Sequence, residues 1–184
     1  MNLRTLQAEF ARLVTNDAAR RSAQRADGAE GSSDTPIDTL ARLPGVDLHA
    51  QTLKRKRLVA ARAKLPVTAA VLDGALAPLF MRFAGETALA SDRRYERDAM
   101  AFLDWLEGEI TSNAEAVAGL DVLALRSAVR FERAVLRVVL RRRVLKIALV
   151  DARRWPGLPP GARRRRVAIW LRVSPNGRLR RWIL

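Results

Sequence analysis

Residues 166–173 read RVAIWLRV, a stretch in which apolar side chains alternate with others at every second position. A period of two predicts a β-strand whose two faces differ. Residues 145–149, LKIAL, alternate in the same way, and the turn sequence SPNG at 174–177 leads into a third such segment, Arg178–Leu184. The C-terminal part therefore predicts a small three-stranded antiparallel sheet with one apolar face and one arginine-rich face.

The chain before this sheet has the periodicity of helices. Apolar residues recur at spacings of three and four, most clearly in residues 91–106 and 120–141. Residues 23–35 are small and polar, which is typical of a flexible connection. We predict an α+β protein with about five or six helices: a helical domain, residues 1–142, followed by a small antiparallel sheet unit, residues 143–184.

Positive charge is concentrated in the last third of the chain. The whole protein carries a net charge of +15, whereas residues 126–184 alone hold 18 Lys or Arg and two acids, Glu132 and Asp151. Like charges at this density repel one another unless a partner or salt screens them. The pattern predicts contact with something acidic, either a peptide or protein or a nucleic acid.

The sequence carries no signature of catalysis. It has no cysteine and a single histidine, His49, so a metal centre would need carboxylates alone. Five carboxylates crowd residues 96–109, but arginines accompany them and surface ion pairs are the simpler interpretation. We predict that the chain is not an enzyme and has no catalytic, cofactor-binding or metal-binding residue.

Two further features bear on localisation. No stretch approaches the roughly 20 apolar residues of a membrane span, so we expect a soluble cytoplasmic protein without a membrane partner. The basic run at residues 54–57, KRKR, is interpreted as a solvated helical face rather than a targeting or nucleic-acid signal.

An arginine stripe on the last helix is the first candidate binding surface. Its members are spaced by four, three and four residues, and no acid on the same helix has a matching spacing. A solvated face usually mixes both signs of charge, so the stripe predicts a partner-binding surface made of Arg126, Arg130, Arg133 and Arg137.

The edges of the predicted sheet are the second candidate. Three strands cannot close on themselves, so an edge is open to an added peptide strand, although its arginines are equally consistent with protection against aggregation. The edge is expected at either residues 145–150 or residues 178–184. The predicted peptide-binding residues are Lys146, Ala148, Val150, Arg172, Arg178, Arg180 and Trp182.

Four stretches together resemble a family of bacterial accessory proteins encoded beside multinuclear non-heme iron-dependent oxidases. These stretches are LQAEF at residues 6–10, RDAMAFLDWL at 97–106, AVRFE at 128–132 and VAIWLRV at 167–173. None is a catalytic signature, and the resemblance rests on their order and spacing over most of the chain.

The resemblance implies a partner subunit that forms a heterodimer with the oxidase, as in methanobactin-type biosynthesis of ribosomally made, modified peptides. It implies that the iron belongs to the oxidase and that the accessory chain holds the leader of the precursor peptide, partly by strand addition. The alternative is a standalone nucleic-acid-binding protein, whose arginines would contact phosphates and whose Trp155, Trp170 and Trp182 would stack on bases.

Overall fold

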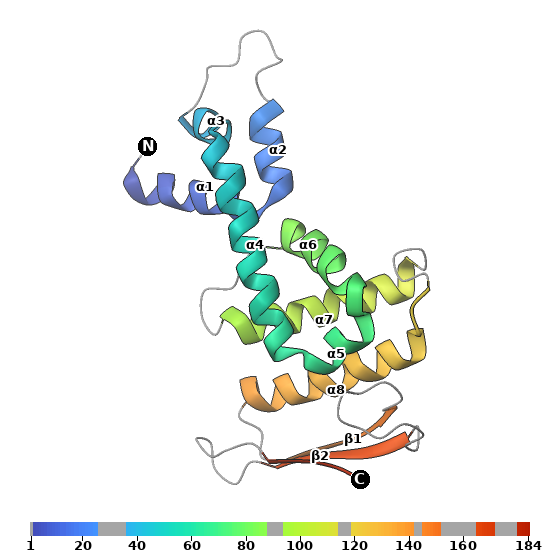
Figure 1. Cartoon of the computed structure of the whole chain (residues 1–184). Helices are drawn as coiled ribbons and strands as arrows, with labels where there is room; N and C mark the ends of the chain where they lie inside the picture. Colours follow the sequence, from blue (N-terminus) through green and yellow to red (C-terminus); the bar gives the residue numbers. More distant parts are fainter. Residues whose placement is uncertain are drawn as a thin grey trace. The chain divides into compact units, whose positions relative to one another are not determined.

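The computed structural model describes residues 2–25, 36–87, 94–113, 119–141, 145–151, 165–171 and 180–184 (Figure 1). Helices occupy most of them, and the strands come last in the chain. The elements are α1 (Leu3–Thr15), α2 (Asp17–Arg25), α3 (Pro36–Ala41), α4 (Pro44–Lys64), α5 (Pro66–Leu72), a 3₁₀ turn (Asp73–Ala75), α6 (Leu76–Glu86), α7 (Arg94–Ser112), α8 (Val122–Arg141), β1 (Leu145–Asp151), β2 (Arg165–Leu171) and β3 (Arg180–Ile183). The α+β class, with a helical part followed by a small antiparallel sheet, is confirmed.

The chain forms two compact units that do not coincide with a division at residue 142. One unit contains Met1–Ala60 and Ala77–Asp92, and the other contains Ala61–Leu76 and Arg93–Leu184. The sheet thus belongs to the same unit as α7 and α8. The connection predicted at residues 23–35 lies outside the described residues from residue 26 onward, and its first three residues end α2.

Two helix boundaries follow from the residues at them. The backbone of Asn16 is extended and ends α1. The Asn16 side chain then accepts a hydrogen bond from the Ala19 amide at 2.9 Å and caps α2. Pro44 follows the end of α3 and begins α4, because proline suits the first helical turn, where no amide hydrogen is needed.

The first unit buries two of the four charges in the basic run at residues 54–57. Lys54 and Arg57 are buried. The Arg57 guanidinium donates to the carbonyls of Ala84 and Thr87 at 3.1 and 2.9 Å, at the C-terminal end of α6, and lies over the Phe83 ring. The interpretation of this run as a solvated face is therefore wrong for these two residues, whereas Arg55 and Lys56 are exposed.

Lys54 belongs to an ion-pair cluster around Asp17. The Lys54 ammonium lies 2.5 Å and the Arg20 guanidinium 2.6 Å from the Asp17 carboxylate. Burial alone would raise the pKa of Asp17, but the hydrogen bond from Lys54 and the charges of Lys54 and Arg20 outweigh it, so the pKa is lowered. Gly85 packs so closely that a Cβ there would overlap this carboxylate.

Asp17→Asn is expected to destabilise the protein near pH 7 and to matter less in acid. A lowered folded-state pKa means that the carboxylate stabilises the fold above its ordinary value of 3.8 and loses this contribution as the pH falls through the folded value. Thermal melts at pH 7 and pH 3 should show the gap between Asp17→Asn and wild type narrowing. Glu9→Gln, at an exposed pair with Arg12, serves as the control and should change little. An equal gap at both pH values would contradict this account.

The segment Pro66–Glu86 differs from the expectation that no stretch is long and apolar enough to cross a membrane. Its 21 residues meet that criterion by length and composition alone. In the structure, however, the 3₁₀ turn separates α5 from α6, and Asp73 takes a positive φ of 45° there. Half of its most apolar 18-residue window is buried inside the protein.

In the second unit, α8 contacts α5, α7 and the sheet. Three consecutive residues point to three neighbours, because each residue turns the helix by about 100°. The Phe131 ring lies against Trp170 of β2, the Glu132 carboxylate accepts amide hydrogens at the start of α5, and Arg133 bonds to α7. Helix α8 is thus the central element of this unit (Figure 1).

The sheet has the order β1-β2-β3, and both pairings are antiparallel. Ile147 is paired with Ile169, which is paired in turn with Trp182. Leu149 is paired with Val167, which exchanges two backbone hydrogen bonds with Leu184 at 2.9 and 3.1 Å. The register is unbroken in the described strands, so each row runs across all three.

Candidate binding site on the C-terminal sheet

The two faces of the sheet have opposite environments. Ala168 and Trp170 point toward α8 and are buried, and the Trp170 ring lies 5.0 Å from the Phe131 ring between centroids. Side chains at the alternate positions point away from α8. We call the face that carries them the outer face. Its described apolar residues are Ile147, Leu149, Val167, Ile169, Leu171, Trp182 and Leu184.

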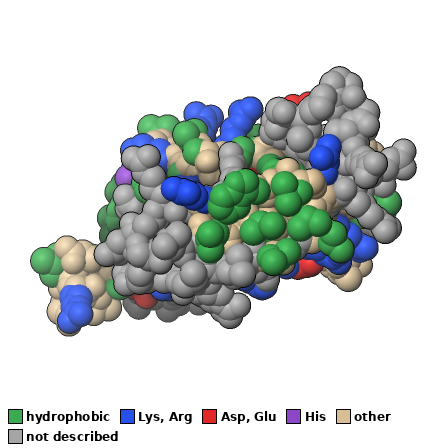
Figure 2. All heavy atoms as spheres, turned by 90° about the horizontal axis from the view of Figure 1, so that it is seen from below, with side chains coloured by type: hydrophobic (Ala, Val, Ile, Leu, Met, Phe, Trp, Pro, Cys, Tyr) green, Lys and Arg blue, Asp and Glu red, His purple; other side chains and the backbone are tan. Residues whose placement is uncertain are grey.

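The outer face is open to solvent. Leu149 is 74% exposed, Ile147 is 58% exposed and Trp182 is 41% exposed. Figure 2, which views the molecule from the sheet side, shows hydrophobic side chains gathered into one patch. An exposed aliphatic patch of this kind typically marks an interaction surface.

The hydrogen-bond pattern shows which edge groups are unused within the sheet. The Val167–Leu184 exchange fixes the alternation: odd-numbered residues of β2 bond toward β3 and even-numbered residues toward β1. In β1, Lys146, Ala148 and Val150 therefore direct their backbone groups toward β2. The β1 residues that direct backbone N–H and C=O groups to the open edge are Leu145, Ile147, Leu149 and Asp151.

This pattern changes the role of three predicted peptide-binding residues. Lys146, Ala148 and Val150 do lie on an edge strand, as predicted, but their main-chain groups bond within the sheet. Their side chains lie outside what the structure describes. The residues that sequence reasoning missed are their neighbours in β1, because only the register tells which alternate set faces outward.

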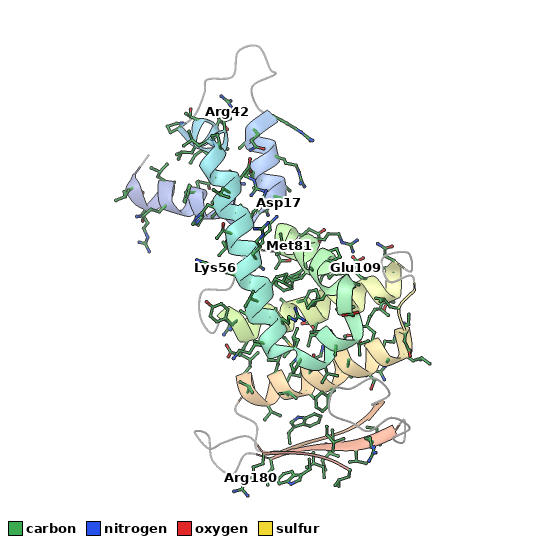
Figure 3. All side chains as sticks on the ribbon, in the orientation of Figure 1. Asp17, Arg42, Lys56, Met81, Glu109 and Arg180 are labelled. Atoms are coloured by element: carbon green, nitrogen blue, oxygen red, sulfur yellow. The ribbon has the colours of Figure 1, made fainter. Side chains whose placement is uncertain are left out.

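The opposite edge is shorter. In β3, Arg181 and Ile183 are the described residues whose backbone groups point away from β2. Arg180 and Trp182 are exposed on this strand, and Figure 3 shows Arg180 projecting away from α8. The predicted residues Arg172 and Arg178 lie outside the described residues.

The arginine stripe on α8 is partly occupied by internal contacts. Arg126, Arg130 and Arg137 are exposed. Arg133 instead forms ion pairs with Asp104, at 2.8 Å, and Glu107 on α7. No acid on α8 has a matching spacing, but two acids from another helix neutralise Arg133.

The other carboxylates on α7 are also in structural contacts. Glu96 pairs with Lys64 at 2.6 Å, and Asp98 is buried and interacts with other groups. The Glu96 pair agrees with the interpretation of these acids as surface ion pairs, whereas Asp98 does not lie on the surface. Among the described residues, no group of three or more His, Cys, Asp or Glu is placed to hold a metal ion.

The tryptophans proposed for base stacking are not equivalent. The Trp170 ring is inaccessible under α8, whereas Trp182 is on the outer face. Trp155 lies outside the described residues. The exposed apolar side chains around Trp182 are aliphatic, and aliphatic groups do not stack on bases as aromatic rings do.

Comparisons of the chain with family models, with curated proteins and with solved structures find no match. The resemblance to oxidase accessory proteins therefore remains a hypothesis that rests on the four stretches of sequence quoted above.

Proposed function

We propose that this chain is a non-catalytic partner subunit that binds a multinuclear non-heme iron oxidase and docks the leader of a ribosomally made precursor peptide by strand addition. The observation that carries the peptide-docking part is the outer edge of β1, which pairs with no other described strand. Four of its residues present backbone groups outward, in a region of the chain with a large excess of positive charge.

The β1 edge suits a peptide better than the β3 edge does. It presents outward backbone groups at four positions against two in the described part of β3. Main-chain bonds supply affinity in strand addition, so a longer edge binds an extended peptide more tightly. Exposed Arg180, on β3 at the other side of the sheet, adds to the positive charge of this region and favours a leader that carries Asp or Glu.

The docked leader would act by tethering. A peptide held on this subunit keeps its core segment at a high effective concentration beside the partner's active site. Weak contacts to the core segment then suffice, so the oxidase tolerates varied core sequences. In this proposal the iron and its ligands belong to the oxidase, and this chain supplies the docking edge.

Ile147→Pro is expected to weaken leader binding at least about tenfold while the fold is retained. The Ile147 amide points to the open edge, so proline removes no bond within the sheet but takes away one donor and obstructs an added strand. Fluorescence anisotropy with a labelled leader peptide measures the change.

Ile147→Ser is the matched control, since it removes the same apolar side chain and keeps the amide. Equal losses in the serine and proline variants would assign the effect to the side chain and contradict strand addition at this edge. A circular dichroism spectrum of each variant verifies the fold.

Co-expression of a tagged copy with the products of its neighbouring genes tests the function as a whole. A stoichiometric complex that contains iron and binds the precursor supports the proposal. A lone protein that retains nucleic acid after high-salt washing would overturn it in favour of a nucleic-acid-binding role.

A further inference from the structure

The outer face of the sheet has an unassigned role, because strand addition uses the backbone edge and not this face. Its exposed apolar side chains are Ile147 and Leu149 on β1, Trp182 on β3, and Leu184 directly after β3. The described side chains of β2 beneath them, Val167, Ile169 and Leu171, are only half-buried. The patch is therefore continuous from one edge of the sheet to the other.

The size of this patch limits what can cover it. Three strands about 4.8 Å apart and rows spanning five residues give an apolar area of order 300 Å². A stable interface buries about 800 Å² on each partner, so a partner seated here must also contact the surroundings of the patch. The sheet belongs to the most basic part of the chain. Exposed Arg180 is paired with Leu171 and lies at one end of the outer face.

Charge argues against a second copy of this chain as the occupant. A two-fold dimer through this face would bring two segments with 18 Lys or Arg and two acids each into contact. Like charges placed against one another at an interface cost several kcal/mol. A partner that carries carboxylates around an apolar centre has the complementary pattern.

We propose that the outer face is the docking surface for a folded protein whose contact region has an apolar centre and a rim of Asp and Glu. The inference rests on the proposed function, in which the oxidase subunit is that protein. It places the partner on the sheet rather than on the α8 stripe, where Arg133 already bonds to α7.

The proposal has a geometric consequence for the leader. A strand added at the β1 edge would widen the sheet by about 5 Å. Its side chains would alternate between the two faces, so half of them would join the outer face. A partner on that face would touch the leader as well, and each would strengthen the binding of the other by the same factor.

The test uses the full chain, co-expressed with the neighbouring oxidase, and measures complex formation by affinity capture and titration. Leu149→Glu and Trp182→Glu each place a negative charge on one side of the patch. Both wild-type side chains are exposed and neither belongs to the buried core, so the fold should be retained. Each is expected to weaken oxidase binding at least about 100-fold, because the carboxylate would be buried against apolar side chains.

Val59→Glu is the matched control. The exposed fraction of Val59, 70%, is similar to the 74% of Leu149, and Val59 lies on α4 in the other unit. It should bind the oxidase as wild type does. Undiminished binding by Leu149→Glu and Trp182→Glu would overturn the docking surface and leave the proposed function standing. Failure of the wild-type chain to bind the oxidase would overturn the proposed function itself.

Measurements of the oligomeric state and of nucleic-acid binding are two further tests of the docking surface. A wild-type homodimer that Leu149→Glu makes monomeric in sedimentation would assign the face to a second copy and overturn the inference. The inference would also fail if Leu149→Glu abolished binding of a fluorescent 20-nucleotide single strand that the wild-type chain binds at physiological salt. Monomeric wild-type protein and an unaffected oligonucleotide titration are the results expected.

Discussion

Trp170→Ala is expected to destabilise the protein by about 3–5 kcal/mol, the usual cost of truncating a buried aromatic side chain. Trp170 is 0% exposed and packs on Phe131 of α8, so it joins the central strand to the central helix of its unit. Because a domain is stable by only about 5–15 kcal/mol, this loss is a large fraction of the total. Urea unfolding followed by far-UV circular dichroism measures it.

Trp170→Phe separates ring packing from the indole N–H. Among the described residues, none accepts a hydrogen bond from the buried Trp170 Nε1. Phenylalanine removes this unpaired donor and keeps a ring against Phe131, so we expect it to cost less than about 1.5 kcal/mol. The account would be contradicted if the alanine variant unfolded at the same urea concentration as wild type.

The strands and the helix before them were predictable from periodicity, but the orientation of the sheet was not. Alternation in RVAIWLRV separates Val167, Ile169 and Leu171 from Ala168 and Trp170 and assigns neither set to the core. The structure buries the second set, since Trp170 fills the space beside Phe131 and Ala168 is small enough for α8 to pack closely. The more uniformly aliphatic face is left to solvent, and that face became the candidate docking surface.

The sequence predicts which strands lie at the edges of the sheet, but not which of their residues direct backbone groups outward. Residues 145–150 lie on an edge strand, but whether Lys146 or Ile147 directs its amide outward depends on the register with β2. A shift of one residue would reverse the answer, and the sequence contains no direct signal for it.

Charged residues were misassigned where their partners lie on other elements. Helical spacing within residues 126–137 shows no acid opposite Arg133, yet Asp104 and Glu107 reach it from α7. In the same way, the run at residues 54–57 gives no hint that Arg57 bonds to carbonyls at the end of α6. Such contacts are tertiary, so the spacing of charges along one helix cannot reveal them.

Glu132→Ala is expected to cost about 3–5 kcal/mol. The buried Glu132 carboxylate accepts hydrogen bonds from the amides of Val67 and Thr68 at 2.7 and 3.0 Å. Pro66 has no amide hydrogen, so these are the first donors of α5, and a carboxylate also suits the positive end of the helix. Alanine would leave two buried donors without acceptors, at about 1–3 kcal/mol each, and a cavity between α5 and α8.

Glu132→Gln is the control that isolates the charge. Its amide oxygen still accepts one of the two hydrogen bonds, so we expect an intermediate loss of about 1–2 kcal/mol. Equal losses for Gln and Ala would mean that the negative charge, and not the number of acceptors, holds α5 on α8.

The same experiment bears on the excess of positive charge in residues 126–184, where Glu132 is one of only two acids. A large loss in Glu132→Ala would show that this carboxylate serves the amides of α5 and not the exposed arginines of the same segment. Those that the structure describes are Arg126, Arg130 and Arg137 on α8 and Arg180 on β3, and they would then be available to an acidic partner.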